Sequence, residues 1–173
     1  MQQRRYMHQI SIRGLLISWL LIITTYHTGA IAGSKSVKLS EMFVAPRYTI
    51  TYPDHWVDYP SSYDRNSLII YNQEQPAIHT GVAPLYMIKT NINISLEEDL
   101  EMGVIAEKIE QVIVDGRVGV RIWAETESDF PNVISTLIPI SDWEVISISS
   151  FYSLENQYAE SAILQVHDSL TLQ

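Results

Sequence analysis

Two consecutive β-hairpins in the second half of the chain constrain its fold more than any other feature. Residues 110–114 and 117–125 are rich in β-branched side chains and flank Asp115-Gly116, a dipeptide favoured in two-residue hairpin turns. Residues 132–138 and 144–152 form a second pair of the same kind. Hairpins join strands that run in opposite directions, so four such strands predict an antiparallel sheet.

Three segments earlier in the chain add further strands. Residues 48–52 alternate aromatic and β-branched side chains and stop at Pro53, which cannot donate to a strand ladder. Residues 67–71 read as a buried strand, and residues 85–93 as the next one. The first half of the chain is therefore expected to extend the same sheet.

A helix is predicted over residues 95–108. Ser95 and Glu98 have the spacing of a capping box, and the acidic residues 97–99 suit the positive end of a helix dipole. An apolar stripe at helical spacing follows: Leu96, Leu100, Val104, Ile105 and Ile109.

A second amphipathic helix is predicted over residues 155–169. Its inner face consists of Ala159, Ala162, Ile163, Val166 and Leu170. Because both helices must bury their apolar stripes against the sheet, the fold class is α+β.

The first 32 residues have the three parts of a secretory signal. Arg4, Arg5 and Arg13 form a basic start, and residues 15–23 form an apolar run. The small residues Ala30 and Ala32 precede Gly33 at the expected cleavage site. The alternative is a permanent membrane anchor, but the apolar run is shorter than the roughly 18–20 residues that span a bilayer. We therefore expect export to a periplasm or a thylakoid lumen.

Cleavage predicts a signal peptide at 1–32, a flexible lead-in at 33–43 and one domain at 44–173. The mature chain keeps 8 of the 11 basic residues and all 20 acidic ones, so its net charge becomes −12. Such a charge disfavours binding to nucleic acids and to anionic lipid surfaces. The chain has no cysteine, which excludes disulfides and a lipid anchor at the cleavage site.

No catalytic constellation is evident in the sequence. Thiols are absent, no serine lies in a Gly-x-Ser-x-Gly elbow, and no glycine-rich phosphate loop occurs. We therefore expect a protein that is not an enzyme.

Two clusters offer weak candidates for a metal site. Asp54, His55 and Asp58 place three possible ligands within five residues, and His167-Asp168 is a thinner second cluster. Neither has a recognised zinc spacing, and turn chemistry alone explains Asp54 beside a proline. Among the tryptophans, Trp123 is expected to pack within its strand and Trp56 to be the most exposed.

The order and spacing of these motifs resemble PsbP-type (Mog/PsbP-like) domains. The resemblance covers about residues 44–172. It rests on the strand, Tyr-Pro, turn and Trp of residues 48–56, the Ser-Leu-Glu-Glu of 95–98, Asp115-Gly116-Arg117, the Ser-Ser-Phe-Tyr of 149–152 and the closing Asp-Ser-Leu of 168–170.

The resemblance implies an α/β/α sandwich around an antiparallel sheet. It also implies a non-enzymatic extrinsic protein on the lumenal side of photosynthetic membranes, associated with photosystem II. Calcium retention is linked to the family, but no ligand residue is carried over to this chain. The departures are the missing lipidation cysteine and the absence of a long plant-type transit peptide. The alternative is a stand-alone periplasmic binding or envelope-maintenance module of the same fold.

Overall fold

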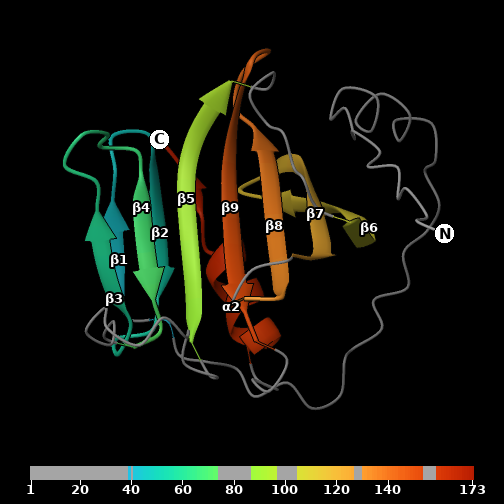
Figure 1. Ribbon diagram of the computed structural model, residues 1–173. Helices are drawn as coiled ribbons and strands as arrows, with labels where there is room; N and C mark the ends of the chain where they lie inside the picture. The colour runs from blue at the N-terminus through green and yellow to red at the C-terminus, as the bar shows by residue number, and fades with distance from the viewer. Residues whose placement is uncertain (1–38, 40, 74–86, 97–104, 127–129, 154–158) are drawn as a thin grey trace, which may run out of the picture.

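A seven-stranded antiparallel sheet forms the main layer of the protein (Figure 1). The computed structural model describes residues 39, 41–73, 87–96, 105–126, 130–153 and 159–173. In sheet order the strands are β3 (Val57–Pro60), β4 (Leu68–Tyr71), β5 (Ile88–Leu96), β9 (Glu144–Tyr152), β8 (Asn132–Pro139), β7 (Arg117–Glu125) and β6 (Ile105–Val114). The two predicted hairpins, β6–β7 and β8–β9, supply four of these strands.

A smaller sheet and one helix complete the described fold. The small sheet has the order β1 (Glu41–Val44), β2 (Tyr48–Tyr52) and β10 (Thr171–Leu172). The helix α2 (Ala159–Asp168) directly precedes β10. β1 begins at Glu41, so it occupies the last residues of the segment that was expected to be a flexible lead-in (33–43).

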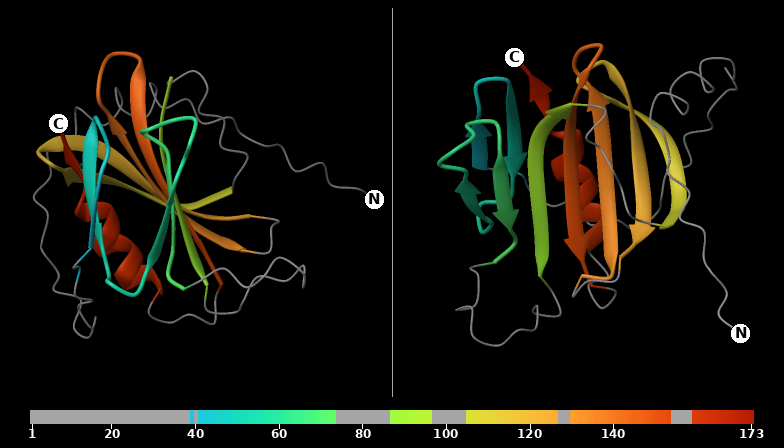
Figure 2. Two further views of the ribbon diagram at one scale, coloured as in Figure 1. Left: turned by 90° about the vertical axis from the view of Figure 1, so that its left-hand side faces the viewer. Right: turned by 45° about the horizontal axis from the view of Figure 1, so that its top comes forward.

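The helix and the small sheet pack on the same face of the seven-stranded sheet. Figure 2 (left) shows the large sheet nearly edge-on, with α2 and the small sheet on one side of it. The core between these layers joins Ile50 of β2, Ile146 of β9 and Ile163 of α2, none of which is exposed to solvent. A second apolar cluster around Ile122 and Leu137 lies on the opposite face of the large sheet.

The turn between β6 and β7 is the one predicted from Asp115-Gly116. Both residues are left-handed, with φ of 51° at Asp115 and 73° at Gly116, as a type I′ turn requires. The turn pairs Val114 with Arg117 and fixes the register of the whole hairpin. The carboxylate of Asp115 also accepts a hydrogen bond from the amide of Leu172, at 2.8 Å, so the turn is tied to the C-terminal strand.

The predicted helix over residues 95–108 is wrong at both of its ends. Ser95 and Leu96 continue β5 and pair with β9, while residues 105–108 open β6 and pair with β7. Cross-strand pairing at both ends outweighs the local capping signal, because backbone partners are available on the adjacent strands. Residues 97–104, the middle of that prediction, lie outside the described residues.

The second helix is confirmed over Ala159–Asp168; residues 155–158 of the prediction lie outside the described part. All five predicted inner-face residues are buried. The antiparallel sheet is confirmed, whereas the α/β/α sandwich is borne out only in part. The described residues form a sheet-dominated fold with one short helix on one face.

The described helix is too short and too polar to cross a bilayer, and no candidate span was found among the described residues. The predicted signal peptide, with its cleavage residues Ala30, Ala32 and Gly33, lies outside them.

Candidate functional site

A chain of buried polar side chains lies between the large sheet and α2. Four adjacent strands each contribute one residue and the helix contributes the fifth: Thr90 (β5), Ser150 (β9), Thr136 (β8), Arg121 (β7) and His167 (α2). Their exposures range from 0 to 4%. The side chains connect in the order Arg121, Thr136, His167, Ser150, Thr90, through contacts of 2.9, 2.8, 2.9 and 2.6 Å.

One assignment of protons gives every side chain in this chain a partner. The Nε–H of Arg121 can only donate, so the Thr136 hydroxyl accepts from it. Thr136 is then free to donate its own hydrogen to Nδ1 of His167, which leaves the ring proton on Nε2. Nε2–H donates to Ser150, and Ser150 donates to Thr90. A neutral imidazole with its proton on Nε2 thus satisfies all four contacts at once.

The same surroundings oppose a charge on His167. Complete burial lowers the pKa of His167 well below its usual range, and the nearby positive charge of Arg121 lowers it further. Arg121 is balanced on the outer side by an ion pair with Asp168. The arginine side chain is 5% exposed and the aspartate 56%, so the pair links the buried chain to the surface.

The Ser150–His167 contact has the spacing of a catalytic pair but not its chemistry. A general base must accept the proton of its nucleophile, whereas in the proton assignment above the imidazole donates to Ser150. Neither side chain is exposed to solvent, so a substrate has no access to the hydroxyl. This arrangement supports a structural role, in which the five side chains fix the position of α2 on the sheet.

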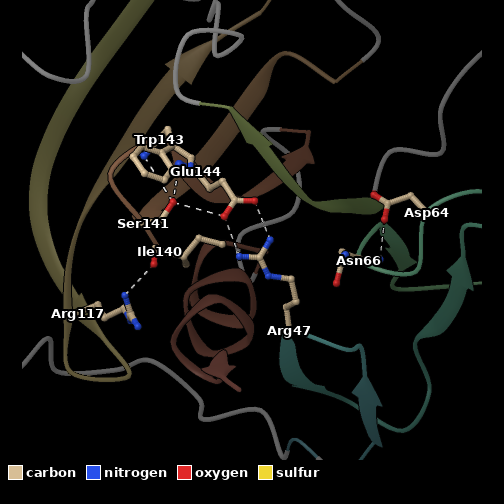
Figure 3. A network of polar contacts seen from close by, with 8 residues as sticks. All are labelled: Arg47, Asp64, Asn66, Arg117, Ile140, Ser141, Trp143 and Glu144. Carbon is tan, nitrogen blue, oxygen red and sulfur yellow. Dashed lines mark hydrogen bonds and ion pairs between the residues drawn. The ribbon is translucent and has the colours of Figure 1, made fainter.

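A second polar network lies at the surface, at the turn between β8 and β9 (Figure 3). Arg47, which precedes β2, forms a two-pronged ion pair with Glu144 at 2.8 and 2.9 Å. This fork geometry matches guanidinium to carboxylate. The hydrogen bond from Arg47 lowers the pKa of Glu144, and the same contact raises the pKa of Arg47. The network therefore ties the small sheet to the tip of the β8–β9 hairpin.

The tip of the β8–β9 hairpin carries an exposed tryptophan, Trp143. The hydroxyl of Ser141 accepts hydrogen bonds from the amides of Trp143, at 3.5 Å, and Glu144, at 3.1 Å. Arg117 reaches across from the β6–β7 turn to the carbonyl of Ile140, at 3.3 Å. Trp143 itself is 63% exposed. Large exposed aromatic residues on ordered surfaces are typical of contact sites for other macromolecules.

The three candidate metal ligands Asp54, His55 and Asp58 are not brought together as one group in the structure. Asp54 and His55 lie in the turn after β2 with their side chains 74% and 65% exposed, and they contact each other at 3.5 Å. Asp58 lies on β3 beside Tyr52, where burial of the phenol raises its pKa and the charge of Asp58 raises it further. Among the described residues, no three His, Asp or Glu side chains are grouped to hold a metal ion.

The second candidate metal pair, His167 and Asp168, is engaged in other contacts. Both ring nitrogens of His167 are hydrogen-bonded inside the protein, and Asp168 faces Arg121.

The expectation for the tryptophans was right for Trp123, which is 9% exposed, but wrong for Trp56, which is only 6% exposed. Trp143 is the exposed one, because it lies at the tip of a hairpin, where no other part of the described chain covers it.

Sequence reasoning did not find the buried polar chain. The available signal was a break in the apolar alternation of three strands. On β8, Thr136 occupies a core-facing position between two isoleucines, and on β9, Ser150 lies between Ile148 and Tyr152. On β7, Arg121 lies among buried apolar residues.

Comparison with solved structures identifies the fold. The solution structure of cyanobacterial PsbP (CyanoP) from Synechocystis sp. PCC 6803 superposes with a TM-score of 0.52 at 10% identity. The match covers 86% of this chain and 98% of that chain. This is a PsbP-like fold. A crystal structure from Bacteroides thetaiotaomicron VPI-5482 matches with a TM-score of 0.50 at 12% identity, over 79% of this chain and 49% of that chain.

The PsbP-like fold is shown by shape alone. No protein-family model matches the chain, and no curated protein matches it in sequence. At 10–12% identity surface residues cannot be equated one by one, so the binding residues of this chain must be argued from its own surface.

Proposed function

We propose that this protein is an exported, non-enzymatic PsbP-like accessory or assembly protein. It acts on the lumenal or periplasmic side of a membrane complex, which in an oxygenic host is photosystem II. The observation that carries the proposal is the PsbP-like fold over 86% of the chain. The basic and apolar N-terminal pattern of the sequence supports export.

The interior of the domain supports a role without catalysis. The Ser150–His167 pair is closed to solvent, because neither side chain is exposed. Elsewhere in the described chain the candidate ligands Asp54, His55 and Asp58 are not grouped as a set of three. A protein of this kind acts through its surface.

The tip of the β8–β9 hairpin is the surface that best suits a protein partner. Trp143 offers a large apolar area, and the Arg47–Glu144 ion pair with Ser141 holds the tip in place before binding. A preorganised contact loses little conformational freedom when the partner binds. Tryptophan is also among the residues that contribute most to protein interfaces.

The test is retention on native membranes. The tagged full-length chain is expressed in its own host, and membranes are washed, solubilised and fractionated by complex. We expect the wild-type protein to co-purify with one membrane complex and Trp143→Ala to lose about tenfold or more of that binding. Tyr63→Ala is the matched control, because Tyr63 is fully exposed on a different loop.

Three results would count against all or part of the proposal. Wild-type protein that is recovered only in the soluble fraction, at every salt concentration, would exclude a docking role. Recovery with a complex other than a photosystem would retain the accessory role and reject photosystem II as the partner. Equal loss for Trp143→Ala and Tyr63→Ala would remove the hairpin tip from the binding surface.

A further inference from the structure

The long strand β6 forms one outer edge of the seven-stranded sheet. β6 is ten residues long and, in the described part of the chain, pairs only with β7. Figures 1 and 2 show it at the free edge of the sheet, away from β3 at the other end. A long edge strand exposes a row of backbone donors and acceptors and invites pairing with another strand.

Bulges and charged side chains commonly prevent an edge strand from pairing with another strand, but they do not block most of β6. A bulge interrupts the ladder only between Ala106 and Lys108, near the start of the strand. Lys108, the charge that could block pairing, lies over the ring of Trp123 at 3.8 Å and contacts Glu110 at 2.9 Å. The lysine is thus held against one face of the sheet, and the ladder from 108 to 114 is regular.

The β6–β7 turn determines which backbone groups of β6 face outward. In a two-residue hairpin the residues flanking the turn, here Val114 and Arg117, exchange hydrogen bonds with each other. Hydrogen-bonded pairs recur at every second residue, so the even-numbered residues of β6 bond to β7. The N–H and C=O groups of Ile109, Gln111 and Ile113 therefore point away from β7 and toward the open edge.

We propose that two copies of this chain associate through β6, as antiparallel strands related by a two-fold axis at Gln111. In this register Gln111 lies opposite its own copy, and Ile109 lies opposite Ile113 of the second copy. Three hydrogen-bonded pairs then form, and all six outward groups of each strand find partners, giving six backbone hydrogen bonds across the interface.

Side chains on both faces suit this self-pairing. Ile109 and Ile113 share the sheet face that carries Val118, and pairing places each isoleucine beside the other in the second copy. Ile113 is 72% exposed and Val118 46% exposed, so apolar surface is removed from water. On the other face Glu110 lies opposite Val112 of the second copy, and its charge is already balanced by Lys108.

A single introduced cysteine tests the register. The full-length chain contains no cysteine, so every disulfide must involve the introduced residue. In the proposed pair the two copies of residue 111 have Cα atoms about 5.5 Å apart, which a disulfide can bridge. The two copies of residue 109 are offset by four residues, or about 14 Å, which it cannot.

We expect Gln111→Cys to oxidise to a covalent dimer at least about tenfold faster than Ile109→Cys, measured by non-reducing electrophoresis at equal concentration. The two variants share the same N-terminal segment, so any association through that segment affects both equally. Equal oxidation rates would overturn the register, and a wild-type chain that sediments as a monomer at all concentrations would overturn the association.

A proline variant tests the edge hydrogen bonds without breaking the fold. The amide of Gln111 faces outward, so Gln111→Pro removes a donor from the new interface and none from the β6–β7 ladder. Gln111→Thr keeps the amide and is the matched control. We expect the proline variant to dimerise at least about tenfold more weakly than the threonine variant, with both showing the wild-type circular dichroism spectrum. Equal dimerisation by the two folded variants would refute pairing through β6; this inference does not depend on the proposed function.

Discussion

Acidification below about pH 6.5 should destabilise this domain first through His167. Complete burial and the neighbouring Arg121 lower the pKa of His167 in the folded state, whereas in the unfolded chain the pKa is near 6.5. Between these two values the unfolded state binds one more proton than the folded state. The contribution of the neutral imidazole is therefore fully present above about pH 6.5 and is lost as the pH falls toward the folded-state pKa.

The magnitude follows from this single-proton difference. One extra proton on the unfolded chain makes the free energy of unfolding fall by about 1.4 kcal/mol per pH unit in that range. Protonation would also reverse the hydrogen bond at Nδ1, where Thr136 donates. Thr136 would then have to accept from both His167 and Arg121, and its hydroxyl hydrogen would lose its partner.

The assay is urea denaturation at several pH values between about 5 and 8, followed by circular dichroism. His167→Gln should flatten the pH dependence, while at pH 8 it should cost about 1–3 kcal/mol because buried hydroxyls lose their partner. His55→Gln, which removes an exposed histidine, is the control for the loss of one imidazole and should keep the wild-type slope. A wild-type slope that persists in His167→Gln would refute the reasoning.

Three further predictions concern single contacts, each measured by equilibrium denaturation near neutral pH. Gly119→Ala should destabilise the domain by about 1–3 kcal/mol, because a Cβ atom there would lie 2.6 Å from the carbonyl oxygen of Leu137. Gly116→Ala should cost less, about 1 kcal/mol, since the added methyl meets only open space and the cost comes from the φ of 73°. Asp168→Asn should cost about 1.5–3 kcal/mol, because the charge of the buried Arg121 loses its partner; an unchanged midpoint would show that water replaces the carboxylate.

The parts of the fold that could be predicted are those set by local chemistry. Asp115-Gly116 fixed the β6–β7 hairpin, because few residues tolerate two successive left-handed conformations. The strands from 117–125 and 144–152 match their predicted ranges. The inner face of α2 was also evident, since its apolar spacing is helical and the burial of Ile163 and Val166 follows from it.

The error over residues 95–108 shows where local chemistry loses to tertiary contacts. Ser95 with Glu98 is a sound helix signal, yet Ser95 lies opposite Val145 in the sheet and Leu96 lies opposite Glu144. β5 runs alongside β9 for its full nine residues. Backbone pairing over that length stabilises the extended form, and no pattern within residues 95–108 reveals that β9 is available.

The buried polar chain could not be assembled from sequence because its members are distant from one another. Thr90 and Ser150 are 60 residues apart, and Thr136 and His167 are 31 apart. Only the register of β5 on β9 brings the first pair together. The polar residues that interrupt the apolar strands can be seen in the sequence. The sequence does not show which of them lie on the same face of the sheet.

This chain of hydrogen bonds connects the sheet register to the placement of the helix. An apolar stripe alone specifies the position of α2 on the sheet less strictly, because the hydrophobic effect is not directional. His167 instead must meet Thr136 on one side and Ser150 on the other, at 2.8 and 2.9 Å. A shift of α2 by one turn would leave buried hydroxyls unpaired, which is costly in the interior. The polar chain therefore selects one position of α2, and the adjacent β10 is brought with it against β2 and the Asp115 turn.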